Sequence, residues 1–457
     1  MHIKFIPHYV FVPAIVFLFA LFASCRTLNR YQSPETDLDA LYRDGSPDDT
    51  STIARIPWNR YFADTCLHAL IAEGLEHNLD LRIAYMRILQ AEAALTVAKS
   101  AYFPTASLAG QMTHSEPETS GNNRFALSVA VQWEADIRGK LNRQSRARYA
   151  QFLQSHAYRN LIETSLVSNI ATSYYTLMAL DEQLRITRET VRLLEESAST
   201  MESLMQAGLL NGAAVEQSKA LLYSTQISLP ELENRIRRME NALSLLTARP
   251  PGPIDRQNIR IQNLPERLKY GVPAQLLSHR PDVKQAELAF RAAFEMKNAA
   301  QAAFYPSLTL SGTLASVLRP EDILLNLVGQ AVQPLFAGNQ LRGQLKTAKA
   351  QQEEALLNFR KALLTAGQEV SDILYAFESS NRKNELRKKQ IETLNTAVLF
   401  TGELLKAGEA NYTEVLTAQQ NLLQAQLAQV SDKLEQIQAV VNLYRALGGG
   451  SEAFGKE

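Results

Sequence analysis

The chain has 457 residues, and its 47 Lys and Arg are balanced by 47 Asp and Glu, so the formal net charge is zero at pH 7. This balance gives the chain as a whole no electrostatic attraction to nucleic acid or to an anionic membrane. Two cysteines exclude a disulfide scaffold and a four-thiolate zinc site, and the seven histidines show no metal-ligand spacing. We therefore expect no nucleic-acid partner, no metal and no cofactor other than a covalent lipid.

Residues 1–24 predict an export signal. The apolar stretch Tyr9–Phe22 is shorter than the roughly 20 residues that a membrane-spanning helix needs. It leads into Leu21-Phe22-Ala23-Ser24-Cys25, which resembles a bacterial lipobox; an ordinary signal peptide with a chance cysteine is the alternative. On the lipobox interpretation Cys25 carries lipid such as palmitate, Arg26 after it implies retention in the outer membrane, and residues 25–63 form a polar, lipidated N-terminal arm.

A helix is predicted from Asp64 to Tyr102, because Pro104 disfavours helical geometry in the residue before it. The period of the pattern then changes to two. Between residues 124 and 134 large apolar side chains alternate with small or polar ones, as expected for a membrane-barrel strand with its apolar side outward. Residues 105–115 form a weaker partner strand, so a β-hairpin is predicted at about 105–134.

The longest predicted element is a helix at about 140–207, a stretch without proline and without glycine. At 1.5 Å per residue it would extend roughly 100 Å, whereas an ordinary helix has about three turns. Pro230 should kink or interrupt the return helix predicted at about 213–248. The long helix carries a heptad seam that requires a partner helix and consists of Leu177, Leu180, Leu184, Thr187, Val191, Leu194, Ala198, Met201 and Met205.

The pattern is then repeated after a Pro-rich linker at 249–273. Residues 80–104 align with residues 282–306 without a gap, and further on Gly208 aligns with Gly408. Such internal repetition indicates a duplicated structural unit. We predict a first repeat at 64–248, a second repeat at 274–447 and a flexible tail at 448–457. The second repeat contains a β-hairpin at about 307–334, a long helix at about 340–405 and a return helix at about 411–447.

Four strands per chain cannot close a membrane barrel, and an open sheet edge is not tolerated in lipid. The chain must therefore form an oligomer. A dimer would supply eight strands around an interior filled by side chains, whereas a trimer would supply twelve strands and room for a lumen.

The order and spacing of several short motifs resemble the bacterial outer-membrane efflux factors, the TolC/OprM/NodT group, and in particular its lipoprotein branch. The resemblance covers about Trp58 to Gly448. The motifs are Trp58 with Phe62, Asn78-Leu79-Asp80-Leu81, Ala101-Tyr102-Phe103-Pro104, Ala179-Leu180-Asp181-Glu182-Gln183-Leu184, Leu229-Pro230-Glu231-Leu232-Glu233, Glu240-Asn241-Ala242-Leu243, Arg280-Pro281-Asp282-Val283, Ala286-Glu287, Ala303-Phe304-Tyr305-Pro306, Pro334-Leu335-Phe336-Ala337-Gly338, Gly408 with Tyr412, Val415 and Leu416, and Ala418-Gln419.

The resemblance implies a mainly α fold with a membrane β-barrel portion. In this family a homotrimer forms a twelve-stranded barrel in the outer membrane, continuous with a long periplasmic α-helical barrel. The partners implied are a periplasmic adaptor, also called a membrane fusion protein, and an inner-membrane pump of the resistance-nodulation-division type.

Nothing in the sequence supports an enzyme, so we expect function to reside in the bore. The family often carries inward-facing acidic residues after the glycine at position 408, and Glu414 and Thr417 occupy those sites here, with Thr417 departing from the usual aspartate. Repeat symmetry adds Ala214 and Gln217 as candidate gate residues. Three converging carboxylates would repel one another, raise the pKa of some members and bind cations. The alternative is an exposed glutamate that the helix dipole stabilises.

Two further groups of residues are candidates. The turns around Gly208 and Gly408, with Ala207 and Ala407, would form tips for adaptor docking, although glycine also simply terminates helices. Five aromatic residues lie where helix and strand meet, either as a membrane-interface girdle or as core packing: Tyr102, Phe103, Trp133, Phe304 and Tyr305.

The predicted function is an outer-membrane exit duct of a tripartite efflux system, through which small molecules such as drugs pass passively. An outer-membrane duct for type I protein secretion is the alternative within the family. A non-porous, elongated coiled-coil envelope scaffold is the alternative from another class. The alternation at 125–133 argues against the scaffold, because a scaffold needs no lipid-facing strands.

Overall fold

The computed structural model describes residues 30–34, 41, 56–115, 122–262, 280–317, 323–332 and 338–449. Cys25, the predicted signal and most of the predicted arm lie outside the described residues. So do residues 263–273 of the predicted linker, residues 333–334 of the second hairpin, and residues 450–457 of the predicted tail.

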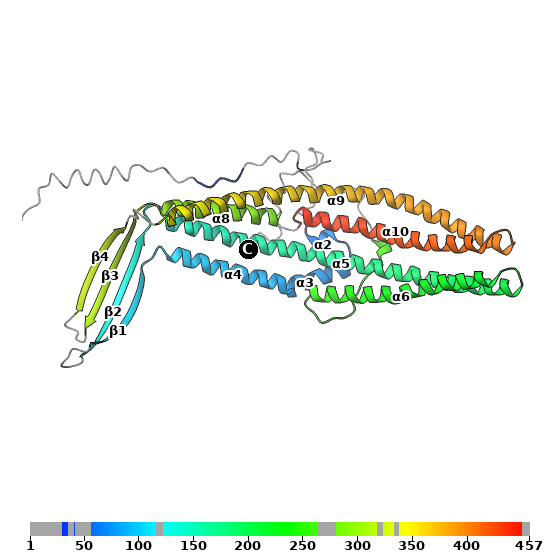
Figure 1. Ribbon diagram of the computed structural model, residues 1–457, viewed down its shortest axis with the longest axis horizontal. Coiled ribbons are helices and arrows are strands. Elements are labelled where there is room, and N and C mark those ends of the chain that lie inside the picture. Colours follow the sequence, from blue (N-terminus) through cyan, green and yellow to red (C-terminus); the bar gives the residue numbers. More distant parts are fainter. Residues whose placement is uncertain are drawn as a thin grey trace, which may run out of the picture. The chain divides into compact units, whose positions relative to one another are not determined.

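Two runs of elements follow one another in the same order (Figure 1). The first consists of α4 (Leu79–Ser100), β1 (Thr105–Ser115), β2 (Asn122–Ala135), α5 (Lys140–Gln206) and α6 (Gly212–Leu246). The second consists of α8 (Pro281–Ala302), β3 (Ser307–Val317), β4 (Ile323–Val332), α9 (Gln340–Lys406) and α10 (Tyr412–Ala446). Corresponding helices have equal lengths of 22, 67 and 35 residues. The prediction of a mainly helical fold built from two tandem repeats is confirmed.

The helix predicted from Asp64 to Tyr102 is in fact two helices, α3 (Thr65–His77) and α4. Asp64 caps α3, its Oδ1 accepting from the backbone N–H groups of Cys66 and Leu67. The break falls at Asn78, whose backbone is extended at ψ 130°. Its side-chain oxygen accepts from the N–H of Leu81, so the residue ends one helix and begins the next.

A matched contact joins the end of each return helix to the start of the preceding short helix of the same repeat. Asn78 Nδ2 donates to the carbonyl oxygen of Leu246 at 2.8 Å in the first repeat. Arg280 Nη1 donates to the carbonyl oxygen of Ala446 at 2.9 Å in the second. Each bond satisfies a C-terminal helix carbonyl that would otherwise lack an intrahelical partner. Arg280 is buried and also pairs with Asp282 at 2.6 Å and with Glu369 at 2.8 Å.

The chain divides into two compact units. One holds the sheet and the adjoining helix ends, residues 98–147 and 291–352 together with the chain's first 34 residues. The sheet is antiparallel in the order β1-β2-β3-β4, so β1 and β4 form its edges. Both edge strands are free of any further strand among the residues that the structure describes.

The two faces of the sheet differ in chemistry. One row across the four strands contains Leu108, Val129, Leu314 and Leu325. The neighbouring row on the other face contains Ser107, Ala130, Thr313 and Asn326. Because side chains alternate between faces along a strand, one face is apolar and the other small or polar. The alternation predicted from the sequence is confirmed.

The other unit is helical, and its four longest helices form an antiparallel layer in the order α6, α5, α10, α9 (Figure 1). Side-chain contacts along the full length of each neighbouring pair establish this order. They join α5 to α6 (Arg188–Glu233, Glu202–Lys219), α5 to α10 (Thr176–Gln438, Ser197–Gln419) and α10 to α9 (Arg387–Asp432, Asn381–Gln436).

The predicted heptad seam of α5 is buried from Leu177 to Met201, whereas Met205 is exposed. The hydroxyl of buried Thr187 donates to the carbonyl oxygen of Gln183 at 2.8 Å, so its burial leaves no donor unsatisfied. Pro230 does not interrupt α6, which runs through it; the packing of Leu232 and Ile236 into the core on its far side holds the helix together. None of the described helices is long and apolar enough to cross a membrane.

We predict that Arg280→Ala lowers the stability of the chain by about 3 kcal/mol at pH 7, because it leaves the carboxylate of Asp282 without its cation and leaves Glu369 with only Arg445, at 3.8 Å. Burial alone would raise the pKa of Asp282, but the hydrogen bonds and charge of Arg280 outweigh it and hold this pKa below its usual value. The stabilisation is therefore present above about pH 4 and lost as the pH falls through the lowered pKa.

Thermal unfolding followed by circular dichroism at pH 7 and at pH 3 measures the effect. Arg382→Ala is the matched control, because Arg382 is exposed and pairs with Glu378 only on the surface; its loss should cost less than about 1 kcal/mol. Equal losses for the two variants would show that Arg280 does not hold the repeat closed.

Candidate functional site

The two long helices end in the same way. Gly208 and Gly408 have positive φ values of 76° and 78°. The residue after each glycine donates its N–H to a carbonyl five positions back, Leu209 to Leu204 and Glu409 to Leu404. This is a Schellman motif, which needs a left-handed residue after the helix and so favours glycine. The interpretation of these glycines as helix terminators is confirmed.

The return helices also begin alike. Asn211 caps α6 through a hydrogen bond from the N–H of Ala214, and Asn411 caps α10 through one from the N–H of Thr413, both at 3.2 Å. Each turn is therefore fixed by a glycine at one end and an asparagine at the other. A rigid turn of this kind presents a defined surface at the end of each helix pair.

The two turns contact each other. Met201 and Val215 of the first helix pair form one buried cluster with Leu405 and Val415 of the second. Ala207, Gly208, Ala407 and Gly408 remain exposed beside this cluster. The candidate docking residues thus share one end of the helical unit, and their role in docking stays a prediction.

The four candidate gate residues fall into two groups. Glu414, Thr417 and Gln217 have exposed side chains in the first turns of α10 and α6. Ala214 is fully buried, at 0% exposure. Burial against its own chain keeps its side chain from facing an aqueous bore, so we drop Ala214 from the gate. Repeat-related positions therefore need not share a surface.

Glu414 has a free carboxylate at this end of the molecule. Two other acidic side chains at this end are neutralised within their own helix pair, Glu202 by Lys219 at 2.5 Å and Glu403 by Lys406 at 2.9 Å. Within the described part of the chain Glu414 forms no ion pair. Its position in the first turn of α10 places it at the positive end of the helix dipole. The helix dipole therefore accounts for its stability, and an unpaired, exposed carboxylate remains available to bind a cation.

The candidate girdle residues lie in the sheet-bearing unit. Phe103 is 69% exposed and Tyr305 is 40% exposed, with Arg138 stacked 4.2 Å over the tyrosine ring. Trp133 lies on the apolar side of the sheet, and its indole N–H donates to the carbonyl oxygen of Tyr102 at 2.8 Å. Large exposed aromatic rings favour an interface role over core packing. Phe304 is half-buried.

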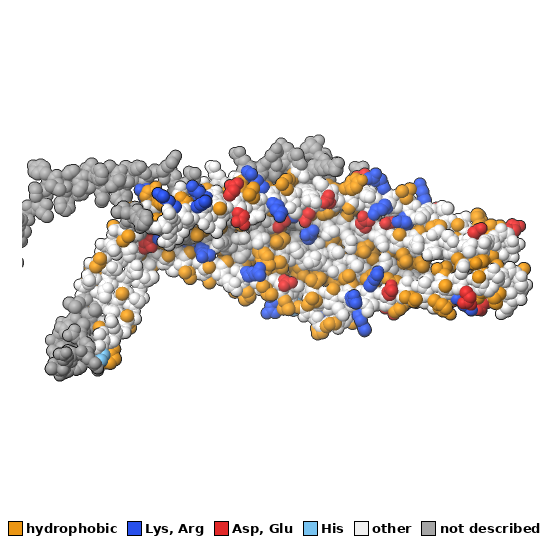
Figure 2. Space-filling view, in the orientation of Figure 1, with side chains coloured by type: hydrophobic (Ala, Val, Ile, Leu, Met, Phe, Trp, Pro, Cys, Tyr) orange, Lys and Arg blue, Asp and Glu red, His pale blue; other side chains and the backbone are white. Residues whose placement is uncertain are grey.

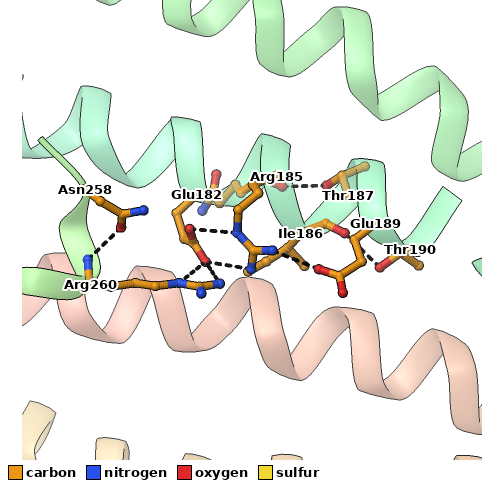
Figure 3. Close-up of polar contacts among 9 residues, drawn as sticks. Glu182, Arg185, Ile186, Thr187, Glu189, Thr190, Asn258 and Arg260 are labelled. Atoms are coloured by element: carbon orange, nitrogen blue, oxygen red, sulfur yellow. Dashed lines mark hydrogen bonds and ion pairs between the residues drawn. The ribbon is translucent and has the colours of Figure 1, made fainter. Parts of the chain in front are cut away.

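Sequence reasoning missed an ionic network that fastens the linker to α5 (Figure 3). Glu182 is buried and accepts hydrogen bonds from Arg260 at 2.8 Å and from Arg185 at 3.0 Å. At the preceding residue of α5, Asp181 accepts hydrogen bonds from Arg256, which also donates to Glu240; these bonds, chiefly those to Asp181, raise the pKa of Arg256. The motif containing Asp181 and Glu182 was visible in the sequence.

The partners of that motif could not be found by spacing, because Arg256 and Arg260 lie more than 70 residues further along in an apparently irregular segment. The segment is not loose where the structure describes it. Ile254 and Ile259 are buried in the main core, and η2 (Ile259–Ile261) forms a short helical turn there. Residues 249–262 of the linker therefore form a packed strap across the helices.

Comparisons with known proteins establish the family of the chain. The sequence model of the outer membrane efflux protein family matches residues 70–249 and 272–449, once for each repeat. The chain belongs to the outer membrane efflux protein family. It is thus an outer-membrane protein with a periplasmic helical extension.

Similar proteins of this family span nearly the same length. The chain is 28% identical over 404 residues to the probable outer membrane lipoprotein SilC of Salmonella typhimurium, covering 86% of this chain and 88% of that protein. It is 26% identical over 440 residues to the cation efflux system protein CusC of Escherichia coli K12, covering 93% and 96%. The toluene efflux pump outer membrane protein TtgC of Pseudomonas putida is also 26% identical, covering 94% and 93%.

Solved structures agree with the fold. The crystal structure of CusC matches with a TM-score of 0.81 at 25% identity, covering 93% of this chain and 100% of that one. The open-state outer membrane channel MtrE of Neisseria gonorrhoeae matches with a TM-score of 0.82 at 24% identity, covering 93% and 98%. The fold is therefore that of the outer-membrane efflux channels.

We predict that Glu414→Gln weakens block of the single-channel current by divalent cations about tenfold, which corresponds to about 1.4 kcal/mol of cation binding. The reason is the loss of the unpaired carboxylate near the tip. Recordings in planar bilayers with added magnesium or cobalt measure the half-blocking concentration. Glu392→Gln, an exposed glutamate further up α9, is the control. Unchanged block and conductance in Glu414→Gln would remove this residue from the gate.

Proposed function

We propose that the chain is the outer-membrane exit duct of a tripartite efflux system and conducts small solutes passively. The observation that carries the proposal is the sheet with one apolar and one polar face, in a chain whose two longest helices have 67 residues each. Apolar rows suit lipid, and rows of serine, threonine, alanine and asparagine suit a wet lumen. Helices of about 100 Å reach far from a membrane. A scaffold without a pore would need neither sheet face.

A homotrimer is supported by the outer surface of α9. Six of the seven large apolar side chains that are 41–68% exposed on α9 lie within an arc of about 40° at 100° per residue, and Leu399 lies outside it. Buried α9 residues such as Phe359 and Val370 lie on the opposite side of the helix. Such a stripe requires another helix to cover it. Its members are Leu357, Leu364, Tyr375, Leu386, Phe400 and Leu404.

The other edge of the helical layer carries a matching surface. Tyr223 and Ile227 on α6 are 57% and 61% exposed, and Ile83 and Met86 on α4 are 51% and 50% exposed. Since α6 and α9 lie at opposite edges of the layer, a contact between them must join different copies head to tail. Such contacts close into a ring when the rotation allows. Three copies supply twelve strands, enough to close a barrel with a lumen.

We assign the exposed turns at Gly208 and Gly408 to docking of a periplasmic adaptor, which links the duct to an inner-membrane pump of the resistance-nodulation-division type. TtgC is named as a pump component, which supports the assignment of a pump. We also propose a covalent lipid on Cys25, supported by its lipobox-like sequence and by the name of the lipoprotein SilC.

Substrates are small toxic compounds, with metal cations and organic solvents as the first classes to test. The cation efflux protein CusC and the toluene pump protein TtgC, both 26% identical to this chain, point to these classes. Deleting the gene should lower the inhibitory concentration of at least one class by about fourfold or more. A plasmid-borne copy of the gene should restore resistance. Loss of a secreted protein without any change in sensitivity would favour the type I secretion duct instead.

We predict that Leu364→Arg with Leu386→Arg converts the oligomer to monomer, because two buried, unpaired cations per interface would cost several kcal/mol. Light scattering after size-exclusion chromatography in detergent gives the mass. Asn358→Arg with Glu392→Arg is the control, since both residues are exposed on α9 outside the apolar stripe. A monomeric unaltered protein, or equal dissociation of both double variants, would contradict the interface.

A further inference from the structure

The neutral chain hides a local excess of positive charge. In the sheet-bearing unit the described side chains include eleven Lys and Arg but only three Asp and Glu. The acidic residues are Glu134, Asp136 and Glu295; the basic residues are Arg30, Lys99, Arg138, Lys140, Arg143, Arg146, Arg291, Lys297, Arg342, Lys346 and Lys349. Figure 2 shows blue side chains gathered where the strands end and the long helices begin.

Two of the acidic residues are already neutralised. Glu134 pairs with Lys140 at 2.7 Å, and buried Glu295 pairs with Arg143 at 2.8 Å. Some of the remaining basic side chains lie close enough to repel one another. Burial lowers the pKa of Lys297, and the charges of Lys349 and Arg143 lower it further. The described part of the unit therefore carries more positive charge than its own described carboxylates balance.

Both long helices add to this imbalance. A helix start favours acidic side chains, because its exposed N–H groups carry partial positive charge. Within α5 itself no acidic residue precedes Glu163, although Asp136 just before the helix accepts hydrogen bonds from the N–H groups of Leu141 and Asn142; α9 has no acidic residue before Glu353. Basic residues occupy corresponding positions instead, Arg146 in the first repeat and Lys346 in the second, and both are exposed. The excess is thus present in both copies of the repeat.

Contacts tie these cations to the apolar side of the sheet. Trp133 belongs to the apolar face and bonds the carbonyl oxygen of Tyr102. Burial and the charge of Asp136 raise the pKa of the Tyr102 hydroxyl, while a hydrogen bond with Asn142 and the charge of Arg146 act in the opposite direction, so Arg146 lies near this hydroxyl. Arg138 lies over the exposed ring of Tyr305, and Lys99 lies in the last turn of α4, three residues before Tyr102. Lys99, Arg138 and Arg146 are therefore near the aromatic side chains at the end of the apolar face.

We propose that Lys99, Arg146, Arg342 and Lys346, here named the junction collar, bind the phosphate headgroups of anionic phospholipids in the periplasmic leaflet of the outer membrane. The inference rests on the proposed function, because it requires the apolar face to lie in lipid. Exposed cations beside an interfacial tryptophan meet headgroups first. Each Lys or Arg held near an anionic surface contributes about fivefold in affinity, and the contact fixes how deep the strands sit.

Competition between lipids around Trp133 tests the collar. The chain has two tryptophans, and Trp58→Phe leaves Trp133 as the only one. The full-length protein is reconstituted in phosphatidylethanolamine vesicles that contain equal shares of phosphatidylglycerol and phosphatidylcholine, with one of the two brominated. Quenching of Trp133 then gives the relative association of the two lipids. We expect about fivefold preference for phosphatidylglycerol, abolished near 1 M salt.

Lys99→Gln with Arg146→Gln and Lys346→Gln should reduce the preference to below about twofold. These three residues are exposed, and none of them forms an ion pair with a residue that the structure describes. The matched control is Arg360→Gln with Lys361→Gln and Lys389→Gln, three exposed cations on the part of α9 that belongs to the helical unit. The control should keep the preference of the unaltered protein.

Three results would overturn the collar. Equal quenching by both brominated lipids in the unaltered protein would contradict headgroup binding by the collar without contradicting the proposed duct. An altered reversal potential with an unaltered lipid preference in the collar variant would place these cations in the bore. Absence of quenching by either lipid would show that Trp133 is outside the bilayer, and the duct would be lost with the collar.

Discussion

Backbone hydrogen bonding at the edges of the sheet is the constraint on which the rest of this structure depends. A strand in hydrocarbon must pair every N–H and C=O group, since no water is present to replace a partner. The chain supplies four strands and leaves the outer edges of β1 and β4 without a strand of their own among the described residues. Only further copies of the chain can satisfy them. The helical unit independently leads to the same requirement through the exposed apolar stripe of α9.

Duplication provides two equal halves without making them chemically identical. Both repeats close by bonding the last carbonyls of the return helix, but Asn78 does so with a neutral amide and Arg280 with a guanidinium that also holds two carboxylates. The tips differ in the same way, since Ala214 is buried while Glu414 is exposed. A shared backbone has thus left individual positions free to diverge, and among the four candidate gate residues only Glu414, in the second repeat, carries a carboxylate.

Charge in this molecule is organised locally. The sum is zero, yet the strap residues Arg256 and Arg260 neutralise acidic residues of α5, whereas the helix starts beside the sheet retain unbalanced cations. The first arrangement is internal and stabilises the core. The second has no internal counterpart and so points outward, to a negatively charged surface. The net charge of the chain reveals neither of these two arrangements.

The sequence by itself determined the repeat, the helix lengths, the two faces of the strands and the glycine and asparagine of each turn, because periodicity and turn chemistry arise from local backbone geometry. Tertiary structure alone decided the break at Asn78, the continuity of α6 through Pro230, the burial of Ala214 and the pairing of Glu182 with Arg260. These depend on which distant segments come into contact. Charges and hydrogen-bonding groups find partners by proximity in space, and spacing along the chain does not encode that proximity.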